Sequence, residues 1–363
     1  MKLKLLEVVA DSSLSGAPKH VLILSKNLNS TEFDPIVVCP SGWLSAECKK
    51  NKIKTKNINL RGFLDFKSMK NLRKFVQQEK PDLIHLHGIR AGFIGVMALV
   101  GLNQKIIYTE HLYTATYHLK SKTREIIQLF GLIFINLFTK MIITPSIAVR
   151  KFLVERIWVK PTKIQVIPNG LEDFKIKNES SEMKIGFIGS VNQQKGIAEL
   201  IAVMEELETE FPELVLEILG DGPLKEQLEQ KYKNKKEISF LGIKEDIKNF
   251  IAKWKMVVIP SISESFGQVA IEAGIASKPV VATTVGGLPE VVIDETSGVL
   301  VRPSDKEDLK KGISFLLRNP EAAERMGKNG RKIFEKFFTA KKMTAKIEKV
   351  YKIIAGIDES KKN

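Results

Sequence analysis

The chain has 363 residues, 44% of them hydrophobic and 27% charged, so it is long enough for two globular domains and excludes a disordered or fibrous protein. The net charge is +15, and residues 1–170 carry all of it, with 26 Lys and Arg against 11 Asp and Glu. A basic first half predicts an anionic partner. Because no zinc-finger spacing, RNP-like aromatic motif or base-reading basic helix is present, an anionic membrane surface or a pyrophosphate-linked acceptor is favoured over nucleic acid.

The start of the chain, its apolar runs and its cysteines predict a cytoplasmic protein. Charges interrupt residues 1–7 too early for a secretory signal, and the longest uncharged apolar run, 126–139, is too short to span a bilayer. Cys39 and Cys48 are not accompanied by other metal-ligating residues at the spacing of a metal site. They fit a reducing cytosol, so we assign them no role. We therefore expect a cytoplasmic location, with peripheral attachment to the inner face of the cytoplasmic membrane.

Buried strands alternate with helices through the first half of the chain. Helical periodicity covers 19–28 and 65–79. Alternation of this kind predicts a parallel, doubly wound sheet. Apolar runs predict its strands at 3–9, 36–40, 81–88, 105–109, 141–146 and 164–170.

The same alternation restarts near residue 183. Helices are expected at 196–206 and from 224, and strands at 183–189, 214–220, 238–241, 257–259 and 279–282. The fold class predicted is therefore α/β, with two facing Rossmann-like domains. The predicted boundaries are 1–170 for the first domain, 171–182 for a polar linker, 183–335 for the second domain, and 336–363 for a C-terminal helix and tail that packs back across the domains.

Two carboxylates flank a predicted ligand site in the second half. Glu264 follows the strand at 256–261, and Glu272 is expected about two turns into the next helix. Ligands of open α/β sheets bind at the carboxyl ends of the strands, and backbone amides near Phe266 and Gly267 would form an anion site at the helix start. Two acids beside an anion site predict a ligand with hydroxyls and phosphate, such as a sugar nucleotide. The alternative is that both glutamates are solvated structural residues.

An ordered series of motifs in the second half resembles the retaining GT-B glycosyltransferases of family 4. These motifs are PNG at 168–170, KG at 195–196, GDGP at 220–223, FLG at 240–242, PS at 260–261, ESFGQVAIE at 264–272 and VGGLPE at 285–290. The first half resembles the family more loosely, through Gly16, the run 81–88, Glu110-His111 and TPS at 144–146.

The resemblance implies roles for residues of the second half. Glu272 corresponds to the glutamate that binds the nucleotide ribose, Glu264 to the one near the donor sugar hydroxyls, and Lys195 to the lysine on the diphosphate. Catalysis would then be front-face, by positioning and charge stabilisation, without a covalent nucleophile. Ser190 lies at the donor site where the family usually has an arginine, so one of two expected phosphate cations is missing.

Residues of the first half are expected to complete the site. His111 resembles the family histidine that approaches the donor sugar, and the Gly16 loop would allow close backbone approach to the donor. We assign His20 and Arg90 to the acceptor side, and Arg90 is also a candidate replacement for the missing arginine.

His85 and His87 alternate on one face of a strand, as a metal-binding pair would. No third ligand is evident, however, and the resemblance implies a reaction that needs no metal. We therefore expect no metal and no cofactor, and interpret this pair as structural or cleft-lining.

The function predicted is retaining transfer of a hexose or N-acetylhexosamine from a nucleoside-diphosphate sugar to a glycan acceptor. We expect this acceptor to be lipid-linked and to serve bacterial surface polysaccharide biosynthesis. The alternatives are a nucleotide-sugar epimerase on the same fold, and a non-catalytic sugar-nucleotide binding protein, which Ser190 favours. The segment 124–140, flanked by Lys120, Lys122 and Lys140, reads as a buried core helix or as an interfacial helix on anionic lipid.

Overall fold

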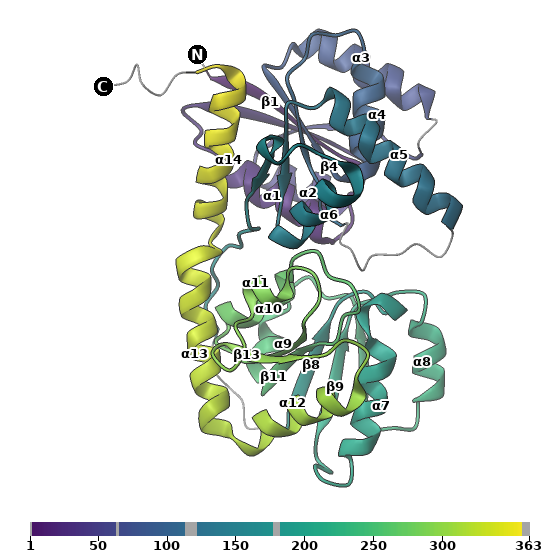
Figure 1. Cartoon of the computed structure of the whole chain (residues 1–363), viewed down its shortest axis with the longest axis vertical. Helices are drawn as coiled ribbons and strands as arrows, with labels where there is room; N and C mark the ends of the chain where they lie inside the picture. The colour runs from purple at the N-terminus through teal and green to yellow at the C-terminus, as the bar shows by residue number, and fades with distance from the viewer. Residues whose placement is uncertain (1, 63–64, 113–121, 177–181, 358–363) are drawn as a thin grey trace. The chain divides into compact units, whose positions relative to one another are not determined.

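The chain forms two compact α/β units in a computed structural model that describes residues 2–62, 65–112, 122–176 and 182–357. The first unit consists of Met1–Gly170 together with Ala340–Asn363, and the second of Leu171–Thr339. Each unit has its own parallel sheet, its own helices and its own hydrophobic core (Figure 1).

The first unit is built on a seven-stranded parallel sheet in the order β3-β2-β1-β4-β5-β6-β7. Its strands are β1 (Leu3–Val9), β2 (Phe33–Cys39), β3 (Lys54–Asn57), β4 (Leu83–His87), β5 (Ile106–Thr109), β6 (Met141–Thr144) and β7 (Ile164–Val166). Its helices are α1 (Gly16–Asn27), α2 (Trp43–Lys50), α3 (Phe66–Glu79), α4 (Gly88–Leu99), α5 (Lys122–Phe138), α6 (Ile147–Ile157), the 3-10 turn η1 (Pro161–Lys163) and α14 (Ala340–Ala355).

The second unit is built on a six-stranded parallel sheet in the order β10-β9-β8-β11-β12-β13. Its strands are β8 (Lys184–Ile188), β9 (Val215–Leu219), β10 (Ile238–Gly242), β11 (Met256–Ile259), β12 (Val280–Thr283) and β13 (Gly298–Val301). Its helices are η2 (Gln193–Lys195), α7 (Ile197–Leu207), α8 (Lys225–Lys231), α9 (Lys248–Lys253), α10 (Gln268–Ile275), α11 (Leu288–Val291), α12 (Lys306–Arg318) and α13 (Pro320–Phe337).

Local sequence signals account for where these elements lie. The central strands are apolar runs because helices cover both faces of a parallel sheet, and β4, β5 and β11 are buried along their whole length. Helix α3 begins after Asp65, whose side chain accepts a hydrogen bond of 3.0 Å from the Ser68 amide and so caps the helix.

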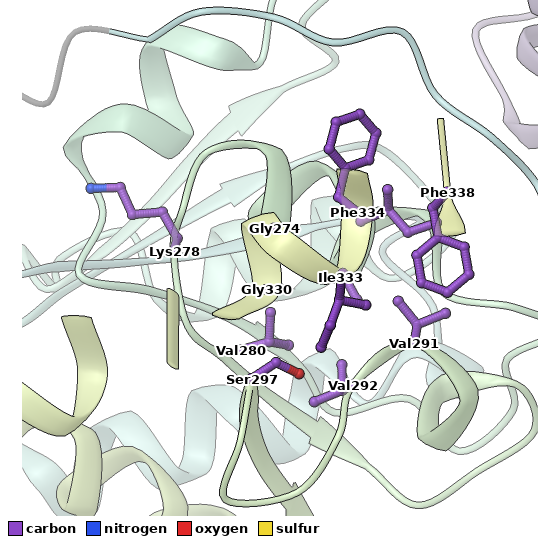
Figure 2. Close-up of a pocket in the computed structure, with 12 residues that line it drawn as sticks. Gly274, Lys278, Val280, Val291, Val292, Ser297, Gly330, Ile333, Phe334 and Phe338 are labelled. Carbon is purple, nitrogen blue, oxygen red and sulfur yellow. The ribbon is translucent and has the colours of Figure 1, made fainter. Parts of the chain in front are cut away.

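The C-terminal helices divide between the two units. Helix α13 packs on α10, with Gly327 so close to the Ser277 carbonyl that a Cβ there would lie 2.0 Å from the oxygen. The apolar pocket between these two helices includes Lys278, whose amine points away from the other labelled side chains (Figure 2) and donates 2.7 Å to the Ala252 carbonyl. The other polar side chain of the pocket, Ser297, accepts a hydrogen bond of 2.9 Å from the Ile293 amide, so we interpret the pocket as a packing seam. The chain then returns to the first unit, where α14 packs on α1.

The predicted α/β class with two Rossmann-like sheets is confirmed, and each predicted strand is present with its ends shifted by up to four residues. The expected C-terminal helix is two helices, α13 and α14. Strand β3 was not predicted because Lys54–Asn57 has no apolar residue, which suits its place at the sheet edge. Among the described residues, no helix has both the length and the apolar character to cross a bilayer.

Candidate functional site

Two loops meet at the carboxyl edge of the second sheet, because β8 and β11 are hydrogen-bonded neighbours. The loop after β8 ends in η2, whose preceding residue Asn192 accepts a hydrogen bond of 3.1 Å from the Lys195 amide. Gly196 follows with φ +66°, and a Cβ there would lie 1.9 Å from the Pro260 carbonyl oxygen. Only glycine allows this approach, so Gly196 holds the η2 loop against the loop after β11.

This approach brings Lys195 and Glu264 together as an ion pair. The Lys195 Nζ lies 2.6 Å from Glu264 Oε2, and the two side chains are 29% and 16% exposed. The Ser261 hydroxyl donates to the same carboxylate oxygen over 3.4 Å, and the Gly287 amide donates to the Glu264 carbonyl over 3.2 Å. A cation and a carboxylate thus lie side by side at the carboxyl edge of the sheet.

The other donor residues predicted in this unit surround the start of α10. Gly267 is the residue before the helix, with φ +100°, and Glu272 is the fifth helical residue, 8% exposed. Glu272 therefore lies just over one turn into α10, whereas the sequence placed it two turns in, because the helix starts at Gln268.

Phe266 and Ser190, two other predicted donor residues, differ in how their side chains are placed. The Phe266 ring is buried in the core, with its centroid 5.7 Å from that of Phe338, so any donor contact of this residue falls to its backbone. Ser190 is exposed and accepts a hydrogen bond of 3.0 Å from the Asn192 amide group.

The first unit gathers four histidines at the carboxyl end of its own sheet. His85 and His87 lie on β4, His111 follows β5, and His20 lies on α1. The His87 Nδ1 and His111 Nε2 atoms are 3.2 Å apart. The ring centroid of His20 lies 5.0 Å from that of His111 and 5.5 Å from that of His87.

Glu7, which is fully buried on β1, anchors this cluster. Its Oε2 lies 2.7 Å from His87 Nε2, and its Oε1 accepts a hydrogen bond of 2.7 Å from the Tyr351 hydroxyl of α14. His85 lies between Tyr351 and Thr109, 2.6 Å from each hydroxyl. Each member of this network is therefore held by at least one buried partner.

The charge states of the cluster follow from burial and from these contacts. Burial raises the pKa of Glu7, but the charge of His85 and the hydrogen bonds with His85 and His87 outweigh it and hold that pKa well below its usual value. Burial lowers the pKa of His87 to about 4 and of His20 to about 3, and it holds the pKa of His111 well below 6.5. Near neutral pH, these three imidazoles are therefore uncharged beside an ionised carboxylate.

The structure brings His20, His87 and His111 together, whereas Gly16 and Arg90 lie apart from their contacts. Gly16 is exposed at the first position of α1, and Arg90 is exposed on the first turn of α4. Among the described residues, the ring and hydrogen-bond contacts of the cluster include neither of them.

Sequence reasoning missed Glu7 and Tyr351. A charged residue within the apolar run 3–9 was the available signal for Glu7, whereas nothing in the helical tail marks Tyr351.

Comparisons with known proteins agree with this geometry. Residues 14–173 match the family model described as glycosyltransferase family 4, and residues 170–333 match that of glycosyl transferases group 1. An uncharacterised glycosyltransferase of Methanocaldococcus jannaschii is 31% identical over 351 residues, which cover 93% of this chain and 94% of that protein.

Two further relatives have more informative names. The UDP-Gal:α-D-GlcNAc-diphosphoundecaprenol α-1,3-galactosyltransferase of Escherichia coli is 26% identical over 380 residues, covering 96% of this chain and 97% of that protein. The crystal structure of the Anabaena protein HepE in complex with UDP-glucose superposes with a TM-score of 0.85 at 19% identity, covering 97% of this chain and 100% of that one. The latter likeness shows that the fold is GT-B.

Proposed function

Since the chain belongs to the glycosyltransferases of family 4, we propose that it transfers a hexose or N-acetylhexosamine, with retention, from a UDP-sugar to a lipid-linked glycan of bacterial surface polysaccharide biosynthesis. The observation that carries the proposal is the Lys195–Glu264 ion pair, which lies at the carboxyl edge of the second sheet beside the start of α10. Ligands of open α/β sheets bind at this edge.

Each part of this edge has chemistry that suits one part of the donor. Lys195 stabilises the negative charge that develops on the departing diphosphate, and the amides at the start of α10 add partial positive charge. Glu264 accepts hydrogen bonds from sugar hydroxyls, and Glu272 accepts them from the ribose. The reaction would thus rest on positioning and charge, with the neutral His111 assigned to the donor sugar.

The choice of uridine rests on the relatives. The E. coli relative is named for UDP-Gal, and the Anabaena protein was crystallised with UDP-glucose. UDP is therefore the first nucleotide to test, ahead of GDP and ADP.

A thermal-shift panel tests the donor site. UDP, GDP, ADP and their common sugar conjugates are added to the wild type, to Glu272→Gln, and to Glu229→Gln as a matched control on the exposed surface of α8. A ligand that binds only the native state stabilises it and so raises the melting temperature. The gain in unfolding free energy is about 2.7 kcal/mol when the ligand concentration is 100 times Kd. We expect UDP compounds to stabilise the wild type and the control but not Glu272→Gln.

The melting shifts, together with assays of transfer and of product release, separate three functions. No shift with any nucleotide would refute the donor site. A shift without transfer to any tested acceptor would indicate a sugar-nucleotide binding protein, and release of a changed nucleotide sugar without an acceptor would indicate an epimerase.

The membrane part of the proposal rests on α5. Its exposed apolar residues lie within an arc of about 120° at 100° per residue, opposite the buried Leu132 and Ile135. An apolar arc of this width on the basic unit fits an anionic membrane surface better than a core helix. The exposed residues are Ile126, Ile127, Phe130, Leu137 and Phe138, and Lys120 of the predicted basic flank lies outside the described residues. The E. coli relative is named for a diphosphoundecaprenol acceptor, which supports a lipid-linked one here.

Vesicle sedimentation tests this surface. The wild type should pellet with phosphatidylglycerol vesicles and not with pure phosphatidylcholine, and Phe130→Ser/Leu137→Ser should lose that binding. Ile243→Ser, which removes a 62% exposed apolar residue of the second unit, is the matched control. Equal binding of both variants would rule out α5 as the contact.

A further inference from the structure

The second unit has a larger cavity at the amino edge of its sheet, opposite the donor residues. Its volume is about 570 Å³, and residues just before β8, β11 and β12 line it together with α12 and α13. Lys255 precedes β11 and Glu264 follows it, so this strand separates the cavity from the loop of the ion pair. We call this cavity the amino-edge pocket. Its size is that of a pocket for a small organic molecule.

Two lysines line the amino-edge pocket without a carboxylate partner. Lys278 is only 7% exposed, and its ammonium donates a hydrogen bond of 2.7 Å to the Ala252 carbonyl. Lys255 is half-buried, and within the residues that the structure describes neither lysine takes part in an ion pair. Glu324, the acid of the lining, lies at the rim, where it is 67% exposed and pairs with Lys328.

A buried ammonium without a counter-charge is unfavourable, and lysine is almost never fully buried unless it is paired. An ammonium has three donors, and the Ala252 carbonyl takes one of those of Lys278. Burial and the charge of Lys255 lower the pKa of Lys278 to about 8, so the two cations repel each other across one pocket. A bound anion would accept the remaining hydrogen bonds and offset both the burial and the repulsion.

The rest of the lining suits the apolar part of an organic molecule. Ser277 adds one hydroxyl beside Lys278, and most of the other side chains are apolar. A few polar groups among apolar side chains are the usual arrangement of a small-molecule pocket, in which the polar groups fix the orientation of the ligand. The apolar side chains include Met183 before β8, Leu316 and Leu317 of α12, and Ala323 of α13.

We propose that the amino-edge pocket binds a phosphate monoester of an apolar alcohol, with the ammonium groups of Lys255 and Lys278 on the phosphate and the side chains of α12 on the apolar chain. A phosphate monoester carries a charge of about −1.5 to −2 near pH 7, which matches two ammonium groups, and lysine commonly binds phosphate. Because Lys278 is almost fully buried, the phosphate must enter the pocket to reach it. This site is separate from the donor site and does not depend on the proposed transfer reaction.

Calorimetry of the untagged full chain with octyl phosphate tests the pocket. One molecule should bind per chain, and octanol, which lacks the charge, should bind at least about 10-fold more weakly. Lys255→Met and Lys278→Met should each weaken octyl phosphate by about 10- to 160-fold, the loss of one charge-assisted hydrogen bond. Lys253→Met, which removes an exposed lysine outside the lining, is the matched control. Lys195→Met should also leave this affinity unchanged, which distinguishes the pocket from the donor site.

Proton uptake by the wild type tests the role of Lys278 even if Lys278→Met does not fold. At about pH 8.5 the free Lys278 is partly deprotonated, and a bound phosphate should raise its pKa, so binding should take up protons. The uptake is measured as a dependence of the binding enthalpy on the ionisation enthalpy of the buffer. Circular dichroism checks the fold of each variant.

Three results would each overturn the proposal. They are absence of octyl phosphate binding, equal affinity for octanol, and unchanged affinity in folded Lys255→Met. Binding without proton uptake would exclude Lys278 as a contact of the phosphate and so would also contradict it.

Discussion

From the Lys195–Glu264 ion pair we predict that removing a carboxylate from the donor site increases the affinity for one ligand. A nucleoside diphosphate must draw Lys195 away from Glu264, because the two atoms are 2.6 Å apart. Glu264→Gln should therefore tighten binding of the nucleoside diphosphate alone, although it should weaken the sugar nucleotide and slow transfer. A pair that is 29% and 16% exposed is worth about 0.2–1 kcal/mol, so the gain is about 1.4- to 5-fold in Kd.

Lys195→Met, which removes the other partner of the ion pair, measures how much the cation contributes to nucleotide affinity. Lys195→Met should weaken the same ligand by about 10- to 160-fold, because a charge-assisted hydrogen bond is worth about 1.5–3 kcal/mol. In the Lys195→Met background, Glu264→Gln should no longer change the affinity, since no cation remains to be released.

Calorimetry with UDP and a UDP-sugar on the two single variants, the double variant and the control Glu229→Gln measures all of these effects. The reasoning fails if Glu264→Gln weakens UDP as much as the UDP-sugar, or if its effect on UDP persists without Lys195.

Further predictions concern the histidine cluster of the first unit. Tyr351→Phe should cost about 2–4 kcal/mol by breaking one charged and one neutral buried hydrogen bond, and should speed hydrogen exchange in α14 by about 30- to 900-fold. The control Tyr232→Phe, whose hydroxyl contacts the exposed Lys231 and lies 3.5 Å from Glu205, should cost under about 0.5 kcal/mol. The unfolding free energy should fall as pH drops from 6.5 towards 4, by up to about 1.4 kcal/mol per pH unit for each of His20 and His87. The reason is that these histidines take up protons in the unfolded chain, whereas burial keeps their pKa values in the folded chain at about 3 and 4. Urea titrations at pH 7, 6 and 5 measure this slope, which should be shallower in His20→Leu.

The sequence was most informative where short-range chemistry decides the structure. The bounds of β1 could be predicted to the residue, because a strand that is buried on both faces consists mostly of apolar residues. The resemblance to family 4 also predicted that Lys195 and Glu264 belong to one site, and the two side chains lie together at the carboxyl edge of the second sheet. Their direct contact could not be predicted, because it depends on the backbone approach at Gly196.

The histidine cluster was harder to predict because its contacts are distant in sequence. The Glu7 and Tyr351 partners are 344 residues apart, and they meet only because α14 returns to the first unit. Alternation identified His85 and His87 as neighbours but could not show that only His87 faces His20 and His111. Such contacts follow from the fold, and no local pattern in the sequence encodes them.

Stability alone does not explain why a charge lies in the middle of β1. Removing a carboxylate from water costs several kcal/mol, and well-packed apolar residues at such sites are often as stable as the ionic group. The neighbouring residues of β1 are apolar, so Glu7 is the exception that needs a reason. Its contact fixes the proton on His87 Nε2 and leaves the opposite lone pair directed at His111. Glu7 thus costs free energy of folding and orients a neutral imidazole toward His111, the residue that we assign to the donor sugar.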